Sequence, residues 1–157
     1  ESPVLLNLFL KGNAIVNSSA VVRKSLLKEI GGINESVGMI AAEDYNTWLR
    51  IAQISDQFVF LPSVLGFYFI HKQGLSNRNM SIPARNAVDA FLHLANEKER
   101  IIIEATFRYM SGRFNYLARN YAQANSDLWF ALKHGQSRYS IKCLWMIANI
   151  WWFNTLG

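Results

Sequence analysis

The chain has 157 residues, of which 51% are hydrophobic and 17% are charged, and its formal net charge is +5. This composition excludes a wholly disordered chain, because enough apolar side chains are present to form a core. The single cysteine, Cys143, excludes an internal disulfide and a CxxC metal site. No apolar run reaches the ~20 residues that cross a bilayer, and no basic leader precedes the N-terminal apolar run. We therefore expect a cytoplasmic protein.

The first half of the chain predicts strands and helices in alternation. Val22, Leu26 and Ile30 recur on one helical face, and Gly31-Gly32 is expected to end that helix. Glu43 and Asp44 then stand at the start of a second predicted helix. Short apolar runs rich in β-forming residues predict strands. The expected elements are a strand at 13–17, a helix ending near 30, a helix at about 45–53, and strands at 58–61 and 64–70.

The second half shows helical spacing and no further strand pattern. Glycines and small polar residues, such as Gly112 and Gly135, are expected to separate the helices. The expected fold is therefore α/β over residues 1–80, followed by an all-α helical extension over 81–157. The expected helices of the extension are at about 84–96, 98–110, 113–124, 127–133 and 137–153.

Three segments carry a resemblance to a known family. They are GNAIVNSSAVVRKSLLKEIGGINE at 12–35, AEDYNTWLRIA at 42–52, and FVFLPSVLGFYFIHKQGLS at 58–76. In this order they resemble the acceptor-side, C-terminal part of a family 2 glycosyltransferase of the GT-A type. The resemblance implies a partial, Rossmann-like GT-A half with few strands. It covers less than half of the chain.

Five residues depart from the family's usual pattern. Asn46 and Thr47 replace a common Asp-Leu pair. Ile33 and Asn34 stand where the family usually has phenylalanine and aspartate in the turn. Phe69 stands where an arginine usually precedes the histidine. The loss of that arginine puts part of the electrostatics on the diphosphate side in doubt.

The resemblance assigns the catalytic role to Asp44. A positioned carboxylate can take the proton of an acceptor hydroxyl group as that hydroxyl attacks the anomeric carbon of the donor sugar. The resemblance places Glu43 beside it as a residue that orients Asp44 or contacts the acceptor. The structural alternative is that both acids only complement the dipole of the helix that they begin.

Three further residues are candidates for substrate binding. Trp48 has a flat apolar face that can stack on a sugar ring, although core packing is the common fate of a lone tryptophan. Arg50 can contact substrate, or it can pair with an acid and hold its helix in place. His71 follows the last predicted strand, and the resemblance implies that it faces the donor diphosphate and can bind a metal ion.

The resemblance implies a nucleotide-diphosphate sugar as donor, a glycan or lipid-linked acceptor, and transfer with inversion. It also implies a divalent metal ion, manganese or magnesium, held mainly by an Asp-x-Asp motif. No two aspartates of this chain lie within three positions of each other. We therefore expect this chain alone to be inactive and to bind nucleotide sugars weakly.

The uneven distribution of charge along the chain suggests a membrane or a nucleic acid as a further partner. The chain up to Leu75 has six basic and six acidic residues, and the remainder has ten basic and five acidic residues. The basic second half, with its tryptophans, is typical of peripheral contact with the inner face of a membrane, or of a plain solvated surface. A nucleic-acid binder is disfavoured because no recognisable motif is present. The remaining alternative is a non-catalytic, truncated or helical interaction module.

Overall fold

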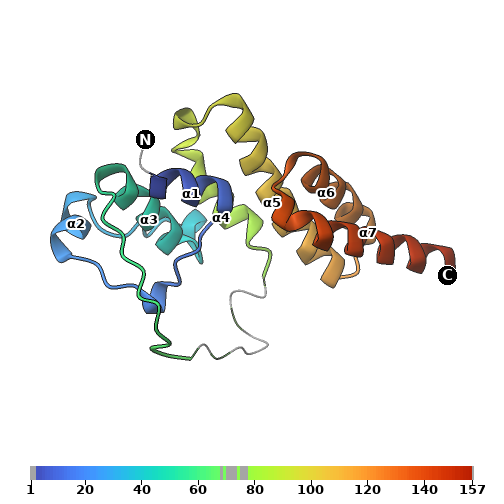
Figure 1. Cartoon of the computed structure of the whole chain (residues 1–157), viewed down its shortest axis with the longest axis horizontal. Helices are drawn as coiled ribbons and strands as arrows, with labels where there is room; N and C mark the ends of the chain where they lie inside the picture. Colours follow the sequence, from blue (N-terminus) through green and yellow to red (C-terminus); the bar gives the residue numbers. More distant parts are fainter. Residues whose placement is uncertain (1–2, 68, 70–73, 75–77, 157) are drawn as a thin grey trace.

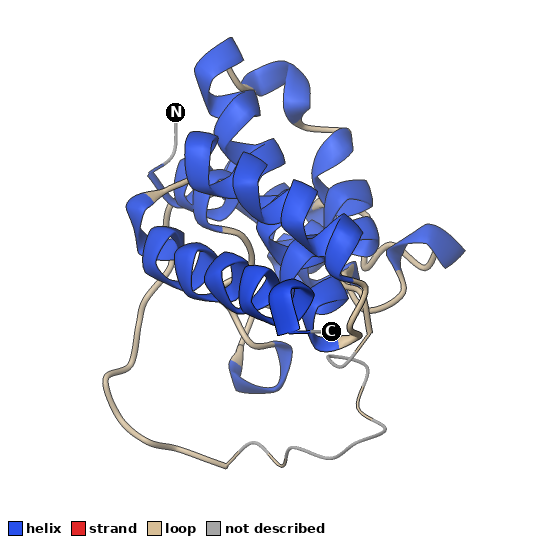
Figure 2. Ribbon diagram, turned by 90° about the vertical axis from the view of Figure 1, so that its right-hand side faces the viewer, coloured by secondary structure: helices blue, strands red, loops and turns tan. Residues whose placement is uncertain are grey.

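The computed structural model describes residues 3–67, 69, 74 and 78–156, and its regular structure there is helical (Figures 1 and 2). Figure 2 colours strands red, and none is drawn in the described residues. The α-helices are α1 (Pro3–Lys11), α2 (Lys24–Glu29), α3 (Glu43–Ile54), α4 (Ser81–Asp89), α5 (Glu97–Leu117), α6 (Tyr121–His134) and α7 (Ser137–Leu156). Short 3-10 helices are η1 (Asn17–Ser19), η2 (Val37–Met39) and η4 (Leu92–Leu94).

The predicted α/β class for the first half is wrong. Residues 13–16 and 58–61 have no regular structure, and neither do the described residues of 64–70. A strand is stable only when a neighbouring strand accepts its backbone hydrogen bonds. The described residues provide no such neighbour. The side chains of the segment at 59–67 accordingly stay in solvent, and Val59 and Phe60 are 84% and 85% exposed.

The turn after α2 follows the sequence expectation. Gly31 and Gly32 both adopt left-handed backbone conformations, with φ of 77° and 83°. The Gly32 N–H group donates a 2.8 Å hydrogen bond back to the Leu27 carbonyl oxygen, which closes the C-terminus of α2. Glycine is needed here because a Cβ atom disfavours this conformation.

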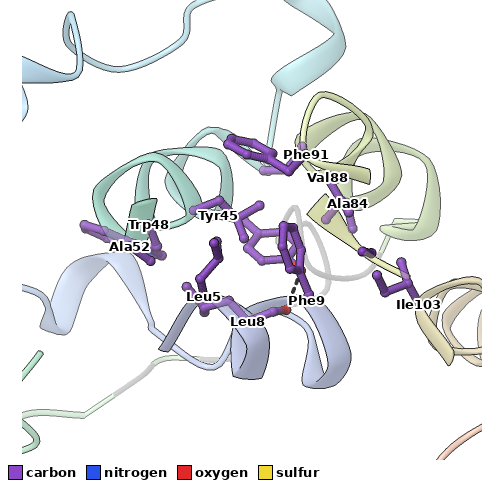
Figure 3. Close-up of a cluster of buried hydrophobic side chains, with 14 of the residues drawn as sticks. Leu5, Leu8, Phe9, Tyr45, Trp48, Ala52, Ala84, Val88, Phe91 and Ile103 are labelled. Atoms are coloured by element: carbon purple, nitrogen blue, oxygen red, sulfur yellow. Dashed lines mark hydrogen bonds between the residues drawn. The ribbon is translucent and has the colours of Figure 1, made fainter. Parts of the chain in front are cut away.

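The first hydrophobic core lies between α1, α3, α4 and the first half of α5 (Figure 3). Leu49 and Val88 are fully buried in it, and Phe9 packs against Phe91 with ring centroids 6.2 Å apart. The dashed line in Figure 3 marks the hydrogen bond between the Tyr45 hydroxyl group and a carbonyl of α1. The buried residues of this first core are Leu5, Leu8, Phe9, Ala42, Tyr45, Trp48, Leu49, Ile51, Ala52, Ala84, Ala87, Val88, Phe91, Ala95, Ile103 and Phe107.

Helix α5 joins this core to a second one. It begins at a capping box, in which Asn96 Oδ1 accepts from Glu99 N at 3.0 Å and Glu99 Oε2 accepts from Asn96 N at 2.8 Å. It then continues through Gly112, where the sequence predicted a break. A Cβ atom on Gly112 would lie 2.9 Å from Leu128 Cγ. Glycine at this position therefore allows the close approach of α6.

The second core lies between α5, α6 and α7. The ion pair between Arg108 and Asp127, 2.8 Å between Nη1 and Oδ1, joins α5 to α6, and Ser111 Oγ donates to the other Asp127 oxygen at 2.7 Å. The turn between α6 and α7 also reaches α1, because Gln136 Nε2 donates to the Leu10 carbonyl oxygen at 2.5 Å. The buried residues of this core are Tyr109, Ala124, Leu128, Ala131, Cys143, Met146 and Ile150.

None of the described helices is long and apolar enough to cross a membrane.

Candidate functional site

The Glu43–Asp44 pair lies in the first turn of α3, as the sequence predicts. Asp44 Oδ1 accepts a 2.6 Å hydrogen bond from the Tyr45 N–H group. Burial raises the pKa of the Asp44 carboxyl above its ordinary value of 3.8, and the neighbouring Glu43 carboxylate also raises it. Hydrogen bonds from Tyr45 N and the Asn13 side chain act in the opposite direction. A carboxylate with a raised pKa is a stronger proton acceptor than a solvated aspartate.

The Asn13 side chain forms a hydrogen bond with Asp44. Its Oδ1 atom accepts a 3.1 Å hydrogen bond from the Ile15 N–H group, so its amide N–H groups are the ones available to Asp44. Gly12 precedes it in a left-handed conformation, with φ of 77°, immediately after α1 ends. The end of α1 therefore turns sharply and presents the Asn13 amide to the start of α3.

Backbone strain occurs at the same place. Ala41, two residues before α3, has φ of 72°, a conformation that residues with a Cβ atom rarely adopt. Strain of this kind persists only where the surrounding structure holds it, and it is frequent near functional sites. Ala41 packs beside the same small cavity that Asn13 lines, so the strained residue is part of the site.

The cavity has a volume of about 170 Å³. Lys11, Asn13 and Tyr45 line it from the first half of the chain, and Thr106 and Tyr139 line it from the helical second half, together with apolar residues such as Met80 and Phe107. The described residues that line it do not include Glu43 or Asp44. Burial raises the pKa of the Tyr45 and Tyr139 hydroxyl groups, which therefore remain protonated at neutral pH. The Tyr45 and Thr106 hydroxyl groups already donate to carbonyl oxygens of α1, so the Asn13 amide is the polar group of the cavity that lies next to Asp44.

Arg50 holds α3 against the end of α2. Its Nη1 atom donates to the Ile30 carbonyl oxygen at 2.7 Å, and its Nη2 atom donates to the Gly32 carbonyl oxygen at 2.6 Å. A cation at the C-terminus of a helix also complements the helix dipole. Burial lowers the pKa of the Arg50 guanidinium. Both terminal nitrogens are engaged within the protein, so this geometry matches the positioning role rather than substrate contact.

Trp48 lies in the first core and is 5% exposed. Its ring presents no open face at the surface, and stacking of a sugar on Trp48 stays a prediction. His71 lies outside the described residues. The structure thus brings together Asp44, Glu43 and Asn13 at one end of α3 and places Trp48 and Arg50 further along the helix.

Helix α3 also carries polar atoms that are buried without a hydrogen-bond partner. The four such atoms found in the described residues are Glu43 Oε2, Asn46 Oδ1, Trp48 Nε1 and Arg50 Nε. A buried polar atom without a partner costs free energy, and a bound ligand or water can remove that cost. Of the four, Glu43 Oε2 belongs to the residue next to Asp44. Because this oxygen has almost no accessible surface, a ligand would reach it only if the start of α3 moved.

A metal centre does not form within the part of the chain that the structure describes, where no three histidine, cysteine, aspartate or glutamate residues gather. The divalent ion implied by the resemblance therefore stays a prediction, and no step of the chemistry below depends on it.

Sequence reasoning missed Asn13 as a site residue. The signal was present as a Gly-Asn pair directly after an apolar helical run, since asparagine side chains commonly hydrogen-bond the backbone two residues later. It was read instead as the first residue of a strand. A scan against protein-family models, a search of curated proteins and a search of solved structures find no match to this chain.

Proposed function

We propose that this chain is the acceptor-side part of an inverting glycosyltransferase, with Asp44 as the catalytic base. The observation that supports this function best is the position of Asp44. It stands at the first turn of a rigid helix, half-buried, with a raised pKa and with Asn13 beside it. The ordered resemblance of the segments at 12–35, 42–52 and 58–76 adds the class of reaction.

In the proposed reaction, the acceptor hydroxyl group attacks the anomeric carbon of the donor sugar. A bond forms between the acceptor oxygen and that carbon, while the bond between the carbon and the diphosphate oxygen breaks. The proton of the acceptor hydroxyl passes to the Asp44 carboxylate, and the nucleoside diphosphate leaves with the bonding electron pair. Attack from the face opposite the leaving group inverts the configuration at the anomeric carbon.

Neighbouring residues prepare Asp44 for this role. The Asn13 amide and the Tyr45 N–H group orient the carboxylate through hydrogen bonds. The Glu43 carboxylate raises the proton affinity of Asp44. Arg50 fixes the helix that carries the pair. These are positioning effects, and such effects account for much of the rate in reactions of this kind.

The donor side belongs to the intact enzyme. We propose a nucleotide-diphosphate sugar as donor, with manganese or magnesium at the diphosphate and His71 on the donor side. The acceptor is a glycan or a lipid-linked saccharide. We place the enzyme in the cytoplasm, at the inner face of the membrane, where lipid-linked acceptors are accessible.

The test is turnover by the intact enzyme that carries this chain. Asp44→Asn keeps the size of the side chain and removes its basicity, so turnover should fall at least ~100-fold. Asp56→Asn is the matched control, because Asp56 is an exposed aspartate after the same helix and should retain full activity. Near-normal turnover of the Asp44 variant would instead favour the non-catalytic interaction module.

A further inference from the structure

The tryptophans of this chain are distributed unevenly between core and surface. Trp48 is 5% exposed, whereas the other four all lie on α6 and α7. Their exposed fractions are 52% for Trp129, 61% for Trp145, 66% for Trp151 and 57% for Trp152. Tryptophan is highly buried on average, so four exposed rings on two adjacent helices indicate an interaction surface.

Helix α7 is apolar on two opposite sides. One side packs into the second core through Cys143, Met146 and Ile150. On the other side, residues at positions i, i+4, i+7 and i+11 form an exposed apolar stripe along the helix. The members of this stripe are Ile141, Trp145, Ala148 and Trp152. The Trp145 ring meets Tyr116 of α5 edge-on, with ring centroids 5.9 Å apart, but Trp145 is still 61% exposed, so the bundle leaves much of this apolar surface uncovered.

An apolar groove continues the stripe toward α6. Its volume is about 480 Å³, and it lies between α6 and α7. Trp129 lines it from α6, and Leu144 and Trp151 line it from α7. Ala148 belongs both to the groove and to the stripe, so the two form one continuous apolar face. We call it the α6–α7 face. Its residues are Trp129, Ile141, Leu144, Trp145, Ala148, Trp151 and Trp152.

The exposed charged side chains of α6 and α7 have one sign. From Ala118 onward the sequence contains four basic residues, Arg119, Lys133, Arg138 and Lys142, and one acid, Asp127. Asp127 is 1% exposed and is paired with Arg108 inside the bundle. Within the described residues, α6 and α7 therefore expose cations and no side-chain carboxylate. Two such faces would repel each other, which disfavours a second copy of this chain as the occupant.

We propose that the α6–α7 face docks on the surface of a lipid bilayer that contains anionic phospholipids. Indole rings favour the interface, where the ring contacts acyl chains and the N–H group contacts headgroups. Lys133 and Lys142 pair with the headgroup phosphates. The transferase proposal is separate from this inference, since the vesicle assay below involves neither Asp44 nor a donor sugar.

Co-sedimentation with vesicles tests the electrostatic part. Vesicles of phosphatidylcholine alone are compared with vesicles in which about one-third of the lipid is phosphatidylglycerol. The chain should bind the anionic vesicles at least ~10-fold more tightly, and added salt should weaken that binding. Lys133→Gln with Lys142→Gln should weaken it by about 10-fold or more. The control pair, Lys24→Gln with Lys28→Gln on α2, removes the same charge from exposed positions elsewhere and should leave binding unchanged.

A second pair of variants tests the aromatic part. Trp129→Ser with Trp151→Ser should abolish most of the binding to the anionic vesicles and most of the blue shift of tryptophan fluorescence that accompanies it. Phe60→Ser with Phe67→Ser removes two exposed rings from the segment between α3 and α4 and should change neither. Equal binding to both kinds of vesicle, or equal weakening by the two lysine pairs, would overturn the proposal. So would self-association in sedimentation equilibrium that the tryptophan changes remove.

Discussion

The Tyr45 hydroxyl group donates a 2.7 Å hydrogen bond to the backbone carbonyl oxygen of Leu8. This buried bond connects α3 to α1 one residue after Asp44. The same carbonyl accepts from the Gly12 N–H group at 3.0 Å, where α1 turns toward Asn13. One carbonyl oxygen thus fixes both sides of the Asp44 site.

Replacement of Tyr45 by phenylalanine should lower the free energy of unfolding by about 1 kcal/mol, because a buried hydrogen bond is lost. The cost stays modest because the Leu8 carbonyl keeps its bond from Gly12. Urea denaturation measures the difference. Tyr116→Phe is the control, since its hydroxyl group has no hydrogen-bond partner among the described residues while its ring contacts remain, and it should cost less than about 0.5 kcal/mol. Equal effects of the two variants would show that the Tyr45–Leu8 bond contributes nothing.

Gly112→Ala should destabilise the protein even though alanine favours helices by about 1 kcal/mol over glycine. The new Cβ atom would lie 2.9 Å from Leu128 Cγ and 3.1 Å from Asp127 Cβ, so α5 and α6 would have to separate. We expect a net loss of about 1–3 kcal/mol in thermal or urea unfolding.

A double-mutant cycle provides the control for Gly112. In a Leu128→Ala background the contact with Leu128 Cγ is gone and the 3.1 Å contact with Asp127 Cβ remains, so adding Gly112→Ala should cost less than it does in the parent. If Gly112→Ala stabilises the parent protein, helix propensity outweighs the contact, and close packing is not the reason for this glycine.

The helices could be predicted where one side of each is apolar and its ends carry specific residues. Gly31-Gly32 identified the end of α2, and the acidic pair identified the start of α3. The apolar spacing placed Val22 in the same helix, but α2 begins only at Lys24. Gly112 was misread as a break because its role depends on Leu128 in another helix, and this relationship is invisible in local sequence. The helix ends instead where Arg119 adopts a left-handed conformation, with φ of 61°.

The strands could not be predicted correctly because β propensity describes a fit to a pleated, paired surface. Residues such as Val59 and Phe60 favour that surface, but the described chain offers them no neighbouring strand. For the site, the Glu43–Asp44 pair was found from its pattern. Asn13 could not be identified as a site residue, because its contact with Asp44 spans thirty-one positions of the sequence and depends on the turn at Gly12.

The pH dependence of stability distinguishes a catalytic Asp44 from a helix cap. Burial raises the pKa of the folded carboxyl above 3.8, so the folded state holds this proton to a higher pH than the unfolded state does. The contribution of Asp44 to stability therefore falls as the pH rises from the unfolded pKa through the folded pKa. Above that range the buried carboxylate is unfavourable. Asp44→Asn should be at least as stable as the parent at neutral pH, and the difference should disappear below the unfolded pKa.

Urea denaturation of the parent and Asp44→Asn at several pH values provides the measurement. Asp56→Asn, at an exposed position, should show no comparable difference. A marked loss of stability in Asp44→Asn at neutral pH would mean that the carboxylate serves mainly to complement the dipole of α3.

The pH profile of kcat/KM for the acceptor, measured on the intact enzyme, tests the role of Asp44 most directly. A general base must be ionised, so kcat/KM should fall as the pH drops through the pKa of Asp44. Because burial and Glu43 raise that pKa, the midpoint of the acid limb should lie above 3.8. We predict that Asp44→Asn loses at least ~100-fold in rate and also loses this limb. A variant with near-normal kcat/KM and the same acid limb would contradict the assignment of Asp44 as the base.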